Sequence, residues 1–209
     1  MSLCKLQITD TFDVVGTQKL YNIKTCWQYL LQQGKLIYGS TFIISPQHKT
    51  TLYKLLVYAI EDAKEMAKYQ LDPRKGILLM GEPNTGKTAM FRLIKSFFPR
   101  KKQYDIKTCR ILSQEFSLKG FEMTTPLFAP NARPLVLDNL GKEMIAKHYG
   151  YASDVVYNIV EHFYEQRYDL SFPKLHITTT LTPIEIEKKY GITFRKMLTE
   201  LFNVIICEA

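Results

Sequence analysis

Long hydrophobic runs are missing from this sequence, and acidic residues are outnumbered. No apolar stretch approaches the roughly 20 residues that cross a bilayer, and the first residues, Met-Ser-Leu-Cys-Lys, have no signal-peptide core. We therefore expect a cytoplasmic protein with no membrane partner. The 28 lysines and arginines exceed the 20 acidic residues, and the net charge of +8 favours a polyanionic partner. The densest basic run, residues 100–102, is typical of either a solvated loop or a nucleic-acid contact.

Cysteine is scarce as well. Only 4 cysteines occur, they form no C-x-x-C pair, and none has a histidine at ligand spacing. This argues against a disulfide framework and against a zinc site. We expect reduced thiols, mostly in the core, at Cys4, Cys26, Cys109 and Cys207. With 46% hydrophobic residues, the 209-residue chain can bury one substantial α/β core and carry an appendage.

One stretch carries a clear chemical signature. Residues 81–88, Gly-Glu-Pro-Asn-Thr-Gly-Lys-Thr, fit the phosphate-loop pattern G-x-x-x-x-G-K-[ST]. An apolar strand is expected before it, at 77–80, and a helix after it, at 89–97. Glycines let backbone N–H groups approach phosphates, and the start of the helix adds a positive dipole end. The pattern predicts a nucleoside triphosphate bound by Gly81, Glu82, Pro83, Asn84, Thr85, Gly86, Lys87, Thr88 and Ala89.

A second apolar run, residues 135–138, ends in a carboxylate. Within the phosphate loop, Lys87 should reach the β and γ phosphates, and the Thr88 hydroxyl should bind Mg²⁺. The strand at 135–138 is the second strand after the phosphate-loop strand, and it ends in a carboxylate. Asp138 is therefore expected to hold the same ion through water. The alternative is an ordinary aspartate that caps a turn at the end of its strand.

Periodicity along the first third of the chain predicts two helices. We expect a loose start over residues 1–16 and an amphipathic helix from Thr17 to Gln33, closed by Gly34. Residues 35–44 look extended, and a long helix should run from Ser45-Pro46 to about Tyr69. Within the first helix, the aromatic residues are expected to pack on the core, with docking of another protein as the alternative.

The remainder of the chain alternates between strand and helix patterns. Five strands separated by helices imply a parallel sheet with both faces covered, and the nucleotide should lie at the carboxyl ends of the strands. The expected elements are a strand at 106–112, a helix capped by Ser113 up to about 120, a loop at 125–133, a helix after Ser153-Asp154, a strand at 174–180, a helix at 182–189 and a strand at 203–207.

Several of these motifs, in this order, resemble the DnaC-like helicase loaders, which are AAA+ ATPases similar to the transposition helper IstB. The resemblance rests on residues 81–88, 136–143, 177–191 and 200–205 and covers about residues 76–209. It implies an α/β P-loop NTPase of the AAA+ type, a three-layer sandwich whose five-stranded parallel sheet has the order 5-1-4-3-2. It also implies ATP and Mg²⁺ as cofactors, nucleotide-dependent self-association, and action on a replicative helicase bound to single-stranded DNA.

The same resemblance divides the chain into an N-terminal appendage, 1–44, which would dock a partner, and an ATPase domain, 45–209. Three positions depart from the family pattern. Asn139 stands where a second acid is usual, Thr180 replaces the sensing asparagine, and Arg195 lies between the positions where arginines reach a neighbouring subunit. An amide cannot take a proton from water, so we expect weak ATP hydrolysis. The nearest other acid, Glu143, is expected on a surface turn.

Three functions remain open at this point. The favoured one is a DnaC-like or IstB-like accessory ATPase of DNA replication or transposition, in which the catalytic residues would be Lys87, Asp138, Asn139, Thr180 and Arg195. The second is a P-loop small-molecule kinase, although residues 178–191 carry no arginine and so do not resemble a kinase lid. The third is a nucleotide-gated scaffold subunit that does not hydrolyse ATP.

Overall fold

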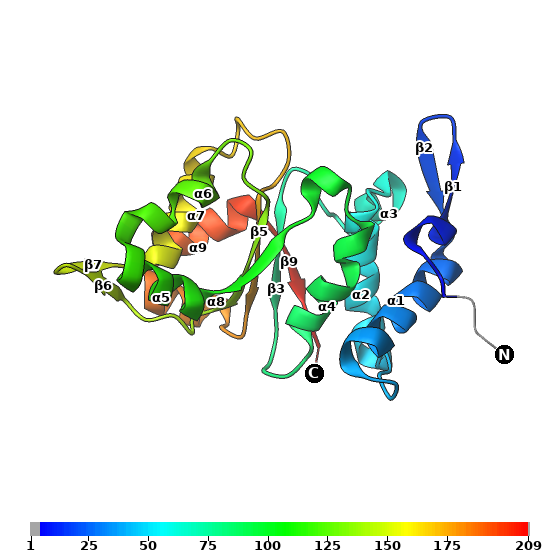
Figure 1. The fold of residues 1–209 in the computed structure, drawn as a ribbon, viewed down its shortest axis with the longest axis horizontal. Coiled ribbons are helices and arrows are strands. Elements are labelled where there is room, and N and C mark those ends of the chain that lie inside the picture. Colours follow the sequence, from blue (N-terminus) through cyan, green and yellow to red (C-terminus); the bar gives the residue numbers. More distant parts are fainter. Residues whose placement is uncertain (1–4, 209) are drawn as a thin grey trace.

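The computed structural model describes residues 5–208 and is built around a five-stranded parallel sheet (Figure 1). The strand order is β4-β5-β8-β3-β9. Counted along the chain from the strand before the phosphate loop, this is the order 5-1-4-3-2, so the expected topology is confirmed. The strands are β3 (Gly76–Met80), β4 (Asp105–Thr108), β5 (Leu135–Leu140), β8 (Leu175–Thr179) and β9 (Phe202–Ile206).

Each face of the sheet carries its own hydrophobic core. Successive side chains of a strand point to opposite faces, so Ile77 and Leu79 of β3 join one cluster, while Leu78 and Met80 join the other. Helices α1, α2 and α4 cover the first face, and α5, α7, α8 and α9 cover the second (Figure 1). The helices are α1 (Ile23–Tyr38), α2 (Pro46–Ala59), α4 (Lys87–Ile94), α5 (Cys109–Lys119), α7 (Val155–Glu165), α8 (Pro183–Tyr190) and α9 (Ile192–Leu201).

Residues 8–21 are more ordered than expected. A 3-10 turn, η1 (Ile8–Thr11), leads into a hairpin of β1 (Phe12–Val15) and β2 (Gln18–Tyr21). The expected loose start is therefore wrong over these residues. Both strands have only 4 residues and are mostly exposed, so their sequence has no apolar alternation to detect. The tight turn between them is made possible by Gly16, whose φ is 62°.

Helix α1 starts and ends later than expected. Its N-cap is Asn22, whose side chain accepts a hydrogen bond from the Thr25 N–H. The helix passes through Gly34 and ends at Tyr38, with Gly39 as its C-cap, so the prediction of a helix end at Gly34 and of an extended segment immediately after it is wrong. Gly34 is needed for packing, because a Cβ there would lie 2.0 Å from the ring of Phe42. Trp27 and Tyr29 of α1 pack against the core, as expected.

The long second helix is divided into two. Helix α2 ends at Ala59, Glu61 has a φ of 58°, and Asp62 then caps α3 (Ala63–Lys68). The second predicted strand, expected at 106–112, is also shorter than expected, because Thr108 caps α5 and the chain turns helical at Cys109. Ser113 is therefore inside a helix and does not cap one. The helix predicted at 89–97 ends in the 3-10 turn η2 (Lys95–Phe97). Further elements that were not predicted are η3 (Arg100–Lys102), η4 (Gly120–Met123), α6 (Thr125–Phe128), β6 (Ala146–His148), β7 (Tyr151–Ser153) and α9.

The two hairpins lie at opposite ends of the molecule, β1–β2 beyond α1 and β6–β7 beyond α5 (Figure 1). The phosphate loop follows β3 at the carboxyl edge of the sheet, and η3 precedes β4 at the amino edge. Among residues 5–208, no helix combines the length and the apolar character that crossing a membrane requires.

Candidate nucleotide site

The loop between β3 and α4 depends on glycines at its two ends. Gly81 has a φ of 152°, and a Cβ at this position would lie 2.3 Å from the carbonyl oxygen of Cys207. Gly86 has a φ of 75° and forms the N-cap of α4. Between them, Asn84 is also left-handed, with a φ of 64°. Residues 82–84 are exposed, whereas Ala89 is half-buried in the first turn of α4.

Lys87 folds back into this loop. Its Nζ donates hydrogen bonds to the carbonyl oxygens of Gly81 (2.7 Å) and Glu82 (2.6 Å) and to the hydroxyl of Thr85 (3.1 Å). Burial lowers the pKa of the Lys87 ammonium, and neighbouring acidic groups partly oppose that shift. A buried ammonium beside a loop of inward-facing backbone groups and a helix N-terminus suits phosphate oxygens, which would replace the carbonyl partners.

Asp138 and Thr88 meet beside the loop. The Thr88 hydroxyl donates a hydrogen bond of 2.6 Å to Oδ1 of Asp138, and only 3% of Asp138 is exposed. The structure thus brings together the two residues that the sequence assigned to one metal ion. Hydroxyl and carboxylate oxygens are the ligands that Mg²⁺ prefers, so these residues fit the ion. Among the described residues, the Asp138 carboxylate accepts hydrogen bonds only from side chains and does not cap a turn.

A β-bulge gives Asp138 this position. Leu137 pairs with Ile177, and Leu140 pairs with Thr179, so Asp138 and Asn139 together face only Thr178. Asn139 adopts a φ of 61°, a conformation that asparagine tolerates better than most residues. The bulge is invisible in the sequence, which shows only an apolar run followed by two polar residues.

Thr178 is a site residue that the sequence analysis did not single out. Its hydroxyl donates to Oδ1 of Asp138 (2.7 Å) and accepts the N–H of Asn139 (2.9 Å), so it fixes both residues of the bulge. Strand alternation could have indicated it, because residues 178 and 180 lie on the same face of β8 and only 178 is inside the strand. Thr178 is fully buried.

Of the other predicted catalytic residues, Asn139 contacts the Thr88–Asp138 pair, whereas Thr180 and Arg195 form no hydrogen bond or ion pair with it. The amide of Asn139 donates to Oδ2 of Asp138 at 3.2 Å. The side chain of Thr180, just past the end of β8, makes no hydrogen bond with any described residue. Arg195 forms an ion pair of 2.9 Å with Glu187, which links α9 to α8 within the same chain.

Glu143 is buried, so the expectation of a surface turn is wrong. Its carboxylate accepts hydrogen bonds from the Gly141 N–H and from Lys189, both at 2.9 Å, and from the Tyr190 hydroxyl. Burial raises the pKa of this carboxyl, but the hydrogen bonds outweigh burial, and the net shift is downward. Glu143 is therefore an ionised anchor between the loop after β5 and the end of α8, and its oxygens are already engaged.

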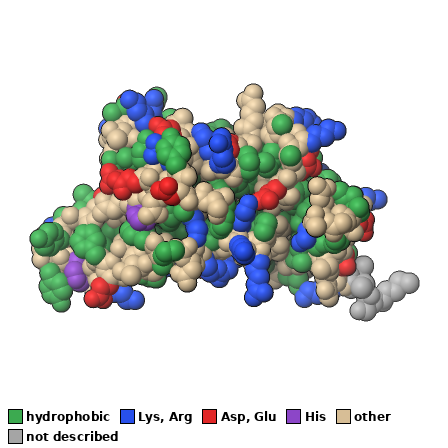
Figure 2. All heavy atoms as spheres, turned by 90° about the horizontal axis from the view of Figure 1, so that it is seen from above, with side chains coloured by type: hydrophobic (Ala, Val, Ile, Leu, Met, Phe, Trp, Pro, Cys, Tyr) green, Lys and Arg blue, Asp and Glu red, His purple; other side chains and the backbone are tan. Residues whose placement is uncertain are grey.

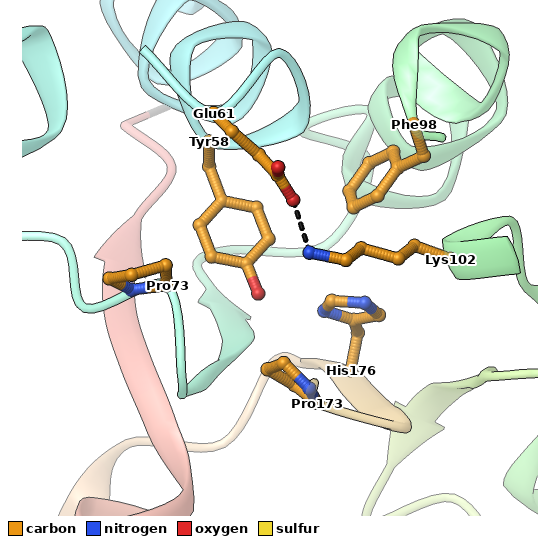
Figure 3. A pocket seen from close by; sticks show the side chains of 7 residues that line it. All are labelled: Tyr58, Glu61, Pro73, Phe98, Lys102, Pro173 and His176. Carbon is orange, nitrogen blue, oxygen red and sulfur yellow. Dashed lines mark hydrogen bonds and ion pairs between the residues drawn. The ribbon is translucent and has the colours of Figure 1, made fainter. Parts of the chain in front are cut away.

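A second buried titratable group lies at the amino edge of the sheet (Figure 3). His176 of β8 accepts the N–H of Ile77 at Nδ1 (3.1 Å), and aromatic rings surround it. Burial lowers the pKa of His176 to about 3, so the ring is neutral. The neighbouring cavity of about 10 Å³ is too small for a ligand larger than water. This cluster is part of the core.

Comparison with known proteins relates the chain to others through its structure. No protein-family model matches it, and no curated protein matches it. The crystal structure of the DnaC helicase loader is similar over 88% of this chain and 99% of that one, with a TM-score of 0.54 and 18% sequence identity. The P-loop NTPase domain of the sigma-54 transport activator from E. coli has a TM-score of 0.43 and 14% identity, over 73% of this chain and 96% of that one. The likeness to the DnaC helicase loader, together with the sheet order and the phosphate loop, shows that this chain has a P-loop NTPase fold.

Proposed function

We propose that this protein is an ATP-binding accessory ATPase of DNA replication or transposition, similar in role to a helicase loader. The observation that carries the proposal is the convergence of Lys87, Thr88 and Asp138 at the carboxyl edge of the sheet. Lys87 would bind the β and γ phosphates, Thr88 would ligate Mg²⁺, and Asp138 would hold the ion through water. The ion would neutralise charge that develops on the phosphates.

Slow hydrolysis is the second part of this proposal. Asn139 offers an amide where a general base would be needed, and it is hydrogen-bonded to Asp138. The nearest further acid along the chain, Glu143, is engaged by Lys189 and Tyr190. Arg195 is paired within its own chain, so a neighbouring subunit would gain its contact only if that pair opened. ATP would then act mainly as a switch between assembly states.

Binding is tested by titration calorimetry with ATP and Mg²⁺. Wild-type protein should release heat that Lys87→Ala abolishes, because the ammonium is the one cation inside the loop among the described residues. Lys101→Ala, an exposed lysine of η3, is the matched control and should bind like wild type. Equal heats from the Lys87→Ala variant and wild type would remove the basis of the proposal.

The role in DNA metabolism is tested separately. Solution mass should be measured with and without ATP, single-stranded DNA and a hexameric replicative helicase. The proposal expects an ATP-dependent increase in mass and a complex with the helicase, both absent in Lys87→Ala. If ATP binds but no assembly forms with any of these partners, the ATP site stands and the loader role is rejected.

A nucleotide-gated scaffold subunit is the second candidate function, and the engaged state of Glu143 favours it. Such a subunit would bind ATP without turnover of its own and would complete the ring of another ATPase. Mixing experiments distinguish the two candidates: a scaffold would raise the turnover of the partner ATPase while contributing none itself, whereas a weak ATPase would show turnover alone that Asp138→Asn reduces.

A further inference from the structure

A groove of about 930 Å³ lies between the β1–β2 hairpin and the segments around α3 and η3. All 4 residues of β2 line it, and Figure 1 shows β2 on the side of the hairpin nearer to α3. Apolar side chains form much of its lining, and the opposite wall comes from residues 96–103. The apolar lining residues are Ile8, Phe12, Leu20, Tyr21, Ile23, Ala59, Ile60, Ala63, Phe97, Phe98 and Pro99.

One edge of the hairpin has free backbone groups. The Asn22 N–H donates to the Thr11 carbonyl at 2.8 Å, in register with the β1–β2 pairs. Hydrogen-bonded pairs alternate along an antiparallel ladder, so Lys19 and Tyr21 direct their N–H and C=O groups away from β1. Within residues 5–208, no further strand pairs with β2. An unpaired edge of this kind is a template for another strand.

The charges around the groove select an acidic partner. Among the described residues, Lys19, Lys64 and Arg100 line it and take part in no ion pair. Of its two acidic residues, Glu61 forms an ion pair with Lys102 (Figure 3), and Asp62 keeps its charge while it caps α3, so basic side chains remain in excess. Figure 2 shows several groups of lysine and arginine side chains on the face of the molecule that includes this region.

From these observations we propose that the groove binds an extended, acidic peptide segment of a partner protein, which pairs with β2 as a third strand. Backbone hydrogen bonds to Lys19 and Tyr21 would hold the segment. Alternate apolar side chains would enter the lining, and acidic side chains would face Lys64 and Arg100. The inference does not depend on nucleotide, because the groove and the phosphate loop lie at different edges of the fold.

The test uses a fluorescein-labelled, capped octapeptide of alternating glutamate and valine, with alternating lysine and valine as the control peptide. Fluorescence anisotropy is measured on the full-length protein without nucleotide. The acidic peptide should bind, and the double variant Lys64→Glu, Arg100→Glu should weaken it at least about tenfold. Lys68→Glu with Lys101→Glu changes the net charge equally outside the groove lining and should leave most of the affinity.

Hydrogen exchange then locates the peptide. The Lys19 and Tyr21 amides should exchange more slowly when the acidic peptide is bound, because they gain partners. Several outcomes would overturn the proposal: no binding up to about 1 mM peptide, equal weakening by both double variants, equal binding of the lysine peptide, or slowing confined to β1. If both double variants weaken binding equally, the peptide is held by long-range attraction to the net positive charge of the protein and not by contacts within the groove.

Discussion

The hydroxyl of Thr88 and the carboxylate of Asp138 are separated by 50 positions in the sequence and lie 2.6 Å apart in the structure. Thr88 lies in the first turn of α4, and Asp138 occupies a bulge in β5, which is separated from β3 by β8 in the sheet. In this arrangement the hydroxyl proton points at the carboxylate. On metal binding it would have to turn away, leaving oxygen lone pairs from both groups available around a single ion.

Replacement of Asp138 by asparagine should separate metal binding from nucleotide binding. The amide keeps the size of the side chain and removes its charge, so affinity for ATP in the presence of Mg²⁺ should fall about 10-fold or more. Affinity in EDTA should be unchanged. Calorimetry under both conditions measures this, with Asp169→Asn, an exposed acid on the loop after α7, as the control. Equal losses with and without metal would show that Asp138 acts on the fold alone.

Replacement of Asn139 by aspartate should increase ATP turnover. The substitution supplies a carboxylate where the hydrolytic base is expected, and a positioned base contributes about 10²-fold or more. Aspartate also tolerates the positive φ of this position. A phosphate-release assay should find Asn139→Asp faster than wild type and Asn139→Ala no faster. A wild-type rate that matches or exceeds that of Asn139→Asp would contradict slow hydrolysis by this site.

The ion pair between Glu143 and Lys189 should stabilise the folded protein by holding the loop after β5 against α8. Only 3% of the Glu143 side chain is exposed, against 36% for Lys189, so loss of the lysine leaves a buried charge. We expect Lys189→Met and Glu143→Gln each to lower the free energy of unfolding by about 1–3 kcal/mol. The double variant should lose less than the sum. Urea denaturation gives all three values, and additive losses would mean that the pair contributes no coupling.

Acid should destabilise the protein through His176. Its folded pKa of about 3 lies below the unfolded value, so stability due to the neutral ring is complete above about pH 6.5 and falls as pH drops toward 3. Between pH 7 and pH 5 this residue should account for a loss of about 2 kcal/mol in the free energy of unfolding. His176→Asn retains an acceptor for the Ile77 N–H and does not titrate.

Urea titrations at pH 7 and pH 5 compare the two proteins. Wild type should lose about 2 kcal/mol more than His176→Asn between these values, because the contributions of the other histidines cancel. The same pH dependence in wild type and His176→Asn would mean that the ring is protonated without penalty in the folded state.

Short-range patterns accounted for much of the site. The apolar run at 77–80 predicted β3, and the glycine spacing after it predicted the loop and the position of Lys87 within it. These features could be predicted because they are formed by residues that are adjacent in the chain. The same kind of reasoning failed at Gly34, which looked like a helix terminator. That glycine lies inside α1, and it is a glycine because Phe42 packs where a side chain would be; this contact is not visible in local periodicity.

By itself the sequence indicated the nucleotide loop, the pairing of Thr88 with Asp138 as candidate metal residues and a parallel sheet, whereas the order of the strands was implied by the resemblance to the helicase loaders. Tertiary structure decided the bulge at Asp138, the contact of Thr178 with it, the burial of Glu143 and the free edge of β2. The reason is physical. Backbone conformation in a loop follows from adjacent residues, whereas hydrogen bonds between strands and helices depend on residues brought together only after the chain has folded.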